Sequence, residues 1–213
     1  MTGRHSTDDL IRDLAARPVP LPPSGGAAFG AMLGAMGIGL GAFWLIFGLR
    51  PDLAHALGLM PVLAKSLLPL VLCGLALTLA LTSARPEARL TIWPLILVPL
   101  LAGLLVVQRL TTLQGAGLWP EVIGHTATSC LAAITGLSLL PLAAGLILLR
   151  RGAPARPALS GALLGLASGA GIAAGYALHC TEDSPLFFVT WYGLAIALAG
   201  GIGAIAGHRL LRW

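Results

Sequence analysis

Residues 126–149 read TATSCLAAITGLSLLPLAAGLILL, and the paired arginines Arg150 and Arg151 follow directly. An uncharged stretch of this length exceeds the ~20 residues that an α-helix needs to cross the hydrocarbon core of a bilayer. Five other apolar segments of spanning length occur at roughly 27–49, 62–83, 91–108, 157–178 and 188–207. The sequence therefore predicts an all-α fold, a six-helix transmembrane bundle that occupies residues 25–213.

The overall composition agrees with a membrane protein. The chain is 57% hydrophobic and 10% charged, whereas soluble domains are about 25% charged. In a soluble protein the net charge of +5 would suggest nucleic acid. Here the arginines stand at the ends of the spans, so membrane topology explains the charge and we expect no direct contact with nucleic acid. Residues 1–24 are polar, acidic and rich in proline, which is unlike a secretory signal.

The distribution of positive charge predicts the orientation of the bundle. If both termini are cytoplasmic, only Arg50, Lys65 and Arg109 of the thirteen Lys and Arg residues fall on the outer side. Positive residues concentrate on the cytoplasmic side of membrane proteins. We therefore expect a multi-pass protein of the bacterial inner membrane with both termini inside, in contact with the lipid bilayer.

Residues 1–24 form a cytoplasmic segment distinct from the bundle. Ser6 or Thr7 can cap a short helix that the later prolines end. The apolar face of this helix carries Leu10, Ile11 and Leu14. Its polar face carries Asp8, Asp9, Arg12 and Asp13, and this acidic character favours docking to a protein over binding to anionic lipid. A disordered tail is the alternative.

Glycines spaced four apart recur in the spans, as at Gly30 and Gly34, or Gly161 and Gly165. Small residues on one helix face allow close backbone approach in lipid. This pattern favours tight packing inside the bundle over a seam between copies, and it leaves the oligomeric state open.

The polar groups at membrane depth argue against an ion-coupled transporter. No span carries an acidic residue, and none has an arginine in its middle third. The polar candidates there are Ser, Thr and Cys73, whereas proton-coupled transporters place ionisable groups at this depth. We expect Cys73 to be an inert buried thiol.

The densest polar stretch is His179-Cys180-Thr181-Glu182-Asp183-Ser184-Pro185, between the last two spans. Cys180 and Cys130 both fall at the outer boundary, in what would be an oxidising periplasm. They are candidates for a redox- or metal-responsive pair, a structural disulfide or two unpaired thiols. His179, His125 and Glu182 could assist a soft-metal site, although no tight spacing identifies a metal. Asp183 is expected to accept backbone N–H bonds at a turn or helix start.

The remaining features of this region complete the sequence prediction. Trp191 and Tyr192 are expected in the aromatic belt at the membrane interface. Sequence motifs typical of hydrolases, phosphate-binding loops or zinc peptidases are absent, so we expect no enzyme.

Three features together resemble the NrsF family of bacterial membrane anti-sigma factors. They are the segment Leu10-Ile11-x-x-Leu14…Pro18-Val19, the outer cysteines Cys130 and Cys180, and the run Glu182-Asp183-Ser184-Pro185-Leu186-Phe187…Trp191-Tyr192-Gly193. The resemblance covers essentially the whole chain. It implies that residues 1–24, including Leu10, Ile11, Leu14, Pro18 and Val19, bind an extracytoplasmic-function sigma factor. It further implies that Cys130 and Cys180 sense oxidant or heavy-metal stress, with metal binding there at most transient and no resident cofactor.

Three hypotheses for the function follow. The leading one is an anti-sigma factor that releases its sigma factor when the cysteine pair changes chemically. The alternatives are a small polytopic transporter or metal-handling membrane protein, and a purely structural membrane subunit.

Overall fold

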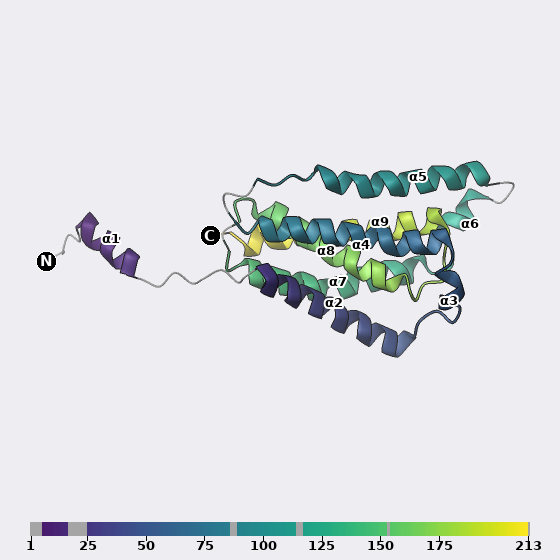
Figure 1. Cartoon of the computed structure of the whole chain (residues 1–213), viewed down its shortest axis with the longest axis horizontal. Helices are drawn as coiled ribbons and strands as arrows, with labels where there is room; N and C mark the ends of the chain where they lie inside the picture. The colour runs from purple at the N-terminus through teal and green to yellow at the C-terminus, as the bar shows by residue number, and fades with distance from the viewer. Residues whose placement is uncertain (1–5, 17–24, 86–88, 114–116, 153, 213) are drawn as a thin grey trace.

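The computed structural model describes residues 6–16, 25–85, 89–113, 117–152 and 154–212, and all regular elements in these ranges are helices (Figure 1). They are α1 (Thr7–Ala16), α2 (Gly25–Phe47), α3 (Leu53–Ala56), α4 (Met60–Thr82), the 3-10 helix η1 (Trp93–Ile96), α5 (Leu97–Thr112), α6 (Leu118–Ile123), α7 (Ala127–Leu149), α8 (Pro157–Tyr176) and α9 (Pro185–Leu210).

Six helical stretches in the described residues are long and apolar enough to cross a membrane. They are Gly26–Phe47, Met60–Thr82, Trp93–Thr112, Leu118–Leu149, Pro157–Tyr176 and Pro185–Leu210. All six predicted segments correspond to one of these stretches. The fourth begins earlier than predicted because the short helix α6 leads into α7 through a turn at 124–126.

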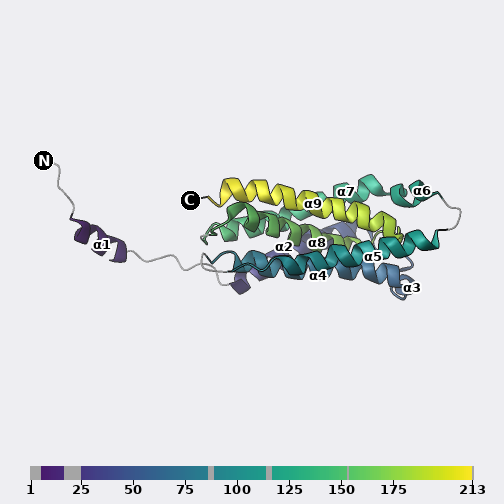
Figure 2. The same ribbon diagram turned by 90° about the horizontal axis from the view of Figure 1, so that it is seen from above.

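Helix α8 is the centre of the bundle. It packs against α4, α7 and α9, and it is the most buried of the six stretches (Figures 1 and 2). By contrast, α5 lies at the outside of the bundle, and most of its apolar side chains are exposed. In a membrane these side chains would face lipid, so their exposure needs no other explanation.

Glycines bring α8 and α9 into backbone contact. A Cβ atom added at Gly161 would lie 2.1 Å from the carbonyl oxygen of Gly203, and one at Gly165 would lie 2.1 Å from that of Ala199. Any side chain at these positions would collide with main chain, which cannot rotate away. The prediction that the spaced glycines serve internal packing is confirmed for this crossing.

The same prediction is wrong for α2. Cβ atoms added at Gly30 and Gly34 would meet nothing within 4 Å. The opposite side of α2 rests on glycines of α8 instead, with Met36 over Gly171 and Leu40 over Gly175, where an added Cβ would come within 3.0 Å of these side chains. Side chains of α2 thus sit in shallow notches of α8.

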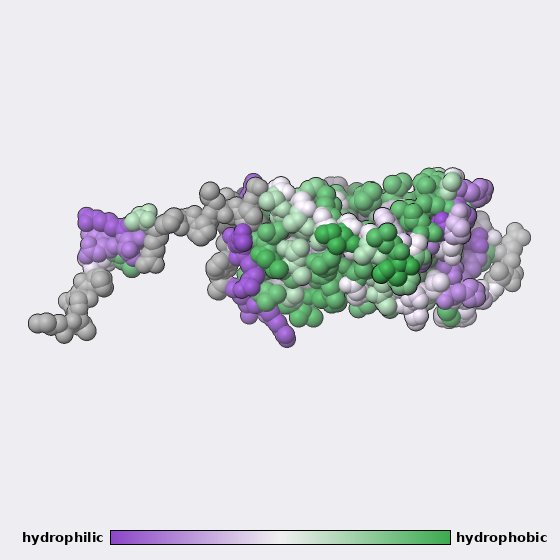
Figure 3. Space-filling view, turned by 90° about the horizontal axis from the view of Figure 1, so that it is seen from below, coloured by the Kyte–Doolittle hydropathy of each residue, from purple (hydrophilic) through white to green (hydrophobic). Residues whose placement is uncertain are grey.

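The two ends of the bundle differ in what they carry. The C-terminus lies at the end nearer α1, and the arginine-bearing connections after α4 and α7 lie at this end too (Figure 1). The loop 177–184 lies at the opposite end with α3 and α6. Figure 3 shows a hydrophobic belt between two hydrophilic ends. In both ribbon views α1 lies apart from the helices of residues 25–213, and the division at residue 24 stays a prediction.

Candidate functional site

Two of the three thiols meet at the end of the bundle opposite α1. Cys130 lies in the first turn of α7, and Cys180 lies in the loop between α8 and α9. Their Sγ atoms are 3.8 Å apart, both residues are buried, and both thiols are free. The hydroxyl of Thr126 lies 3.5 Å from the Cys130 sulfur. The prediction that the two cysteines lie close together is confirmed.

The chain direction explains this meeting. Helices α7 and α8 are joined by the short connection 150–156 and pack side by side in opposite directions. Short connections join adjacent antiparallel helices. The beginning of α7 therefore lies beside the end of α8, and the two cysteines come to one level although fifty residues separate them.

Asp183, within the loop 177–184, is the central residue of a network of ion pairs. Its Oδ1 accepts hydrogen bonds from Lys65 Nζ at 2.6 Å and from an Arg50 guanidinium nitrogen at 2.9 Å. Arg50 also forms a two-bond pair with Asp52, at 2.7 and 2.9 Å. Lys65 Nζ additionally donates to the backbone carbonyl oxygen of Cys180 at 2.6 Å. Lys65 of α4 and Arg50, which follows α2, therefore hold the loop 177–184, called the cysteine loop below.

These contacts change the ionisation of the loop. Burial raises the pKa of Asp183, but hydrogen bonds from Arg50 and Lys65 outweigh it and hold the pKa below its usual value. The hydrogen bonds from Asp52 and Asp183 raise the pKa of Arg50 above its usual range. A hydrogen bond from the Cys130 thiol lowers the pKa of Cys180 to about 6, aided by the Glu182 backbone amide and the charge of Lys65. These contacts therefore favour the thiolate form of Cys180 over the form with a proton.

Lys65 and Arg50 are the functional residues that the sequence reasoning missed. The sequence assigns both only to topology, and it offers Ser, Thr and Cys73 as the polar groups at depth. Lys65 lies in the second turn of α4 and is fully buried. Asp183 is expected to bind backbone amides, and this prediction is wrong because its carboxylate pairs with the two cations instead. The available sequence signal was that Arg50 and Lys65 are among the few cations expected at the same end of the bundle as the carboxylates of the loop.

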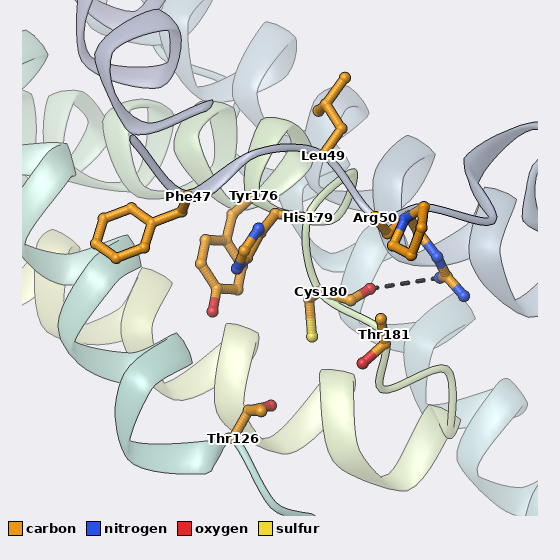
Figure 4. A pocket seen from close by; sticks show the side chains of 9 residues that line it. Phe47, Leu49, Arg50, Thr126, Tyr176, His179, Cys180 and Thr181 are labelled. Atoms are coloured by element: carbon orange, nitrogen blue, oxygen red, sulfur yellow. Dashed lines mark hydrogen bonds between the residues drawn. The ribbon is translucent and has the colours of Figure 1, made fainter. Parts of the chain in front are cut away.

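A pocket of about 280 Å³ lies beside Cys180 (Figure 4). Its wall is formed by Phe47, Leu49, Arg50, Pro51, Thr126, Tyr176, His179, Cys180 and Thr181. His179 Nδ1 donates to the backbone carbonyl oxygen of Gly48 at 2.9 Å, and its ring packs edge-on against Phe43 with centroids 5.0 Å apart. His179 therefore attaches the loop to the end of α2.

Trp191 and Tyr192 hold the first turns of α9. Trp191 Nε1 donates to the carbonyl oxygen of Val122 in α6 at 2.8 Å. Tyr192 is expected in an interface belt, and this is wrong because its side chain is fully buried, with its ring 6.0 Å from that of Tyr176. Packing of the aromatic ring beneath the cysteine loop outweighs the usual preference of tyrosine for a wet boundary.

Glu182 and His125 meet, but not as metal ligands. Glu182 Oε1 accepts the backbone N–H of His125 at 2.8 Å, and the His125 side chain is exposed. The turn before it needs glycine, since Gly124 has φ +54° and an added Cβ would lie 2.6 Å from the Phe187 ring. Nowhere in the described part of the chain do three His, Cys, Asp or Glu side chains converge as a metal site would require. The postulated set with His179, His125 and Glu182 is therefore not assembled.

A second ion pair joins three elements at the same end. Arg109 of α5 donates from Nε to Glu121 Oε2 of α6 at 2.9 Å, and the Ser184 hydroxyl donates to the same oxygen at 2.9 Å. The sequence assigns Arg109 to topology alone. This pair fixes the beginning of α9 without touching Cys180.

Helix α1 has the predicted capping residue. The Ser6 hydroxyl accepts the backbone N–H of Asp8 at 3.2 Å, so Ser6 caps α1. Leu10 and Ile11 are 54% and 57% exposed. Leu14 is helical, whereas its side-chain environment, and both Pro18 and Val19, lie outside the described residues.

Comparison with known proteins shows which family the chain belongs to. The sequence profile described as "NrsF: Negative regulator of sigma F" matches residues 14–213. The chain belongs to the NrsF family. It is 36% identical to the "Anti-sigma-F factor NrsF" of Caulobacter vibrioides (strain NA1000 / CB15N), over 97% of this chain and 99% of that protein. It is 30% identical to the "Probable anti-sigma-F factor NrsF" of Azospira oryzae, over the same shares. No solved structure matches.

Membership of NrsF decides between the classes considered from the sequence. The family is regulatory, so the expectation that the chain is not an enzyme is confirmed. The resemblance drawn from the N-terminal segment, the cysteines and the Glu182–Gly193 run is confirmed as well. The family match includes the whole cysteine loop, and it begins at Leu14, after the exposed Leu10 and Ile11.

Proposed function

We propose that this NrsF chain is an anti-sigma factor of the bacterial inner membrane, with both termini in the cytoplasm. The names of the two relatives support a sigma factor as its partner. The six apolar helices and the gathering of arginines at the end with the C-terminus support the orientation.

In the resting state, α1 binds an extracytoplasmic-function sigma factor. The observation that carries this step is that Leu10 and Ile11 are both more than half exposed on a short, capped helix. Ten residues are too few for a stable isolated helix, so α1 gains stability by burying this face in a groove of a partner. In the sequence pattern Leu14 belongs to the same apolar face, and Pro18 and Val19 follow it along the chain.

The thiol pair senses oxidant or heavy-metal stress on the periplasmic side. Its support is the 3.8 Å separation of Cys130 and Cys180 at the end of the bundle opposite α1. Chemical change at the pair alters the loop, shifts the bundle and releases the sigma factor. A change from 99:1 to 1:99 in occupancy needs a differential stability of about 5.5 kcal/mol.

Substitution in α1 tests the docking step. Leu10→Asp with Ile11→Asp places charge where apolar burial is proposed, and each buried side chain of this size contributes ~1.5–3 kcal/mol. Sigma-dependent transcription should become constitutive while the membrane level of the protein is unchanged. Arg12→Gln, on the polar face of the same helix, is the control and should leave repression intact. Full repression by a normally expressed double variant would rule out docking through α1.

Substitution of the thiols tests the sensing step. Cys130→Ser or Cys180→Ser should abolish induction by an oxidant and leave resting repression in place, because α1 is unaltered. Cys73 is buried in the apolar core away from the pair, so Cys73→Ser should respond like the wild type. Normal induction in either of the first two variants would separate the thiols from sensing.

A further inference from the structure

The two thiols at the site differ in access. Cys180 lines the pocket of about 280 Å³, whereas Cys130 does not line it and is completely buried. Figure 4 shows the Cys180 side chain turned from the loop toward Thr126, within the space that the pocket residues enclose. A small molecule that enters the pocket therefore meets the sulfur of Cys180 and not that of Cys130.

The two thiols also differ in electrostatic surroundings. Lys65 Nζ contacts the backbone oxygen of Cys180 at 2.6 Å and that of Glu182 at 3.3 Å, and Arg50 contacts the Cys180 oxygen at 3.4 Å. These cations hold the backbone of Cys180, and the charge of Lys65 helps to lower the pKa of its thiol. A thiolate beside cations is the form that attacks oxidants, and the lowered pKa of Cys180 agrees with this environment.

The side chains around the two thiols favour oxidation of the pair over stable binding of a metal ion. Across the described ranges no third His, Cys, Asp or Glu joins the pair, and tetrahedral soft-metal sites need four ligands. The pocket is several times the ~30 Å³ that a water molecule occupies in the liquid. It can therefore admit a small hydroperoxide.

Resting on the function proposed above, we propose a division of labour between the thiols. Cys180 reacts first with a small hydroperoxide in the pocket, Cys130 resolves the product, and Lys65 positions Cys180. The Cys180 thiolate attacks the distal peroxide oxygen, the O–O bond breaks, and the alcohol or water leaves with a proton from solvent. Cys180 is oxidised to a sulfenic acid and the peroxide is reduced.

The second step forms a disulfide. The Cys130 sulfur attacks the sulfenic sulfur, the S–S bond forms, the S–O bond breaks, and water leaves with the thiol proton of Cys130. A disulfide requires sulfurs about 2.05 Å apart. From the present 3.8 Å the sulfurs must approach by about 1.8 Å. Cys130 is fixed in a helix, so most of this movement falls to the loop that Lys65, Arg50 and His179 hold.

Trapping of the sulfenic acid tests the order of reaction. The full chain with Cys73→Ser is reconstituted in phosphatidylcholine vesicles, treated with equimolar hydrogen peroxide at pH 7, and probed with dimedone and mass spectrometry. With Cys130→Ser added, dimedone should label Cys180. With Cys180→Ser added instead, labelling of Cys130 should fall to about a tenth of that level or less, since reactivity follows thiolate character and exposure. Equal labelling of Cys130, or labelling of neither thiol, would overturn the proposal.

The pH profile of alkylation tests the positioning role of Lys65. Removal of a nearby positive charge should move the midpoint for iodoacetamide modification of Cys180 to higher pH. From a midpoint near 6, the reaction at pH 6 should then be about fivefold slower after a rise of one pH unit and about tenfold slower for each further unit. The comparison uses Lys65→Met, and Lys65→Met with Asp183→Asn, which leaves no unpaired carboxylate if the single variant folds poorly. Arg109→Gln removes a cation at the same end and should leave the midpoint in place. An unchanged midpoint in both Lys65 variants would overturn the positioning role.

These measurements use purified protein and contain no sigma factor. Failure of the thiol chemistry would therefore leave the α1 test of the anti-sigma function standing, and failure of the α1 test would leave the thiol order standing.

Discussion

Neutralising Asp183 is the most direct test of the ion network. Asp183→Asn keeps the shape of the side chain and removes the charge that faces Lys65 and Arg50, which are 0% and 6% exposed. Arg50 retains Asp52, but Lys65 keeps only backbone carbonyls as partners. Loss of one partner from a buried pair costs ~3–5 kcal/mol. The Asp183 side chain is itself 28% exposed, so we expect the low end of that range, about 3 kcal/mol.

The assay is reversible unfolding in mixed micelles, by titration with sodium dodecyl sulfate and far-UV circular dichroism. Asp52→Asn is the matched control, because Asp52 is 52% exposed and Arg50 keeps Asp183. This variant should lose at most about 1 kcal/mol. In the double variant Lys65→Met with Asp183→Leu both charges are gone, so the loss should be smaller than the sum of the two single losses. If Asp183→Asn unfolds within about 1 kcal/mol of the wild type, the network does not stabilise the loop.

Two other predictions concern the glycine crossing and the thiolate. Gly165→Val should cost at least about 3 kcal/mol in the same assay, because its Cβ would lie 2.1 Å from a backbone oxygen; Gly34→Ala, with open space around it, should be neutral or stabilising. The pKa of Cys180 falls from its ordinary value of 9.0 to about 6 on folding, so its contribution to stability is full above pH 9 and is lost as the pH falls through 6. The stability difference between wild type and Cys180→Ser should therefore shrink from pH 9 to pH 6, and a constant difference would contradict a folded-state thiolate.

The spans were predictable because their signal is local. A stretch such as 126–149 carries its length and apolarity within itself, so each of the six helices appears near its predicted bounds. The proximity of Cys130 and Cys180 required one further step, the short connection between α7 and α8. That step uses chain direction alone, and it was sufficient.

The partners of the loop were not predictable because they come from distant parts of the chain. Arg50 and Lys65 reach Asp183 across more than a hundred residues. Counting charges treats each cation as a topological marker and cannot show which one is buried. Similarly, the spacing of Gly30 and Gly34 equals that of Gly161 and Gly165, and only the bundle geometry shows which pair meets another backbone.

The seating of α2 on the glycine notches of α8 has a mechanical consequence. Met36 and Leu40 are flexible side chains over smooth backbone, whereas α8 and α9 touch main chain to main chain. A movement of α2 along α8 would therefore meet side chains at this contact, whereas a movement of α9 along α8 would meet main chain. The 23 residues of α2 form a rod about 34 Å long. Just beyond its last turn, the carbonyl oxygen of Gly48 accepts a hydrogen bond from His179 of the cysteine loop. At its other end, α2 is preceded in the chain by α1. A displacement of the cysteine loop would therefore act directly on the end of α2 through this hydrogen bond.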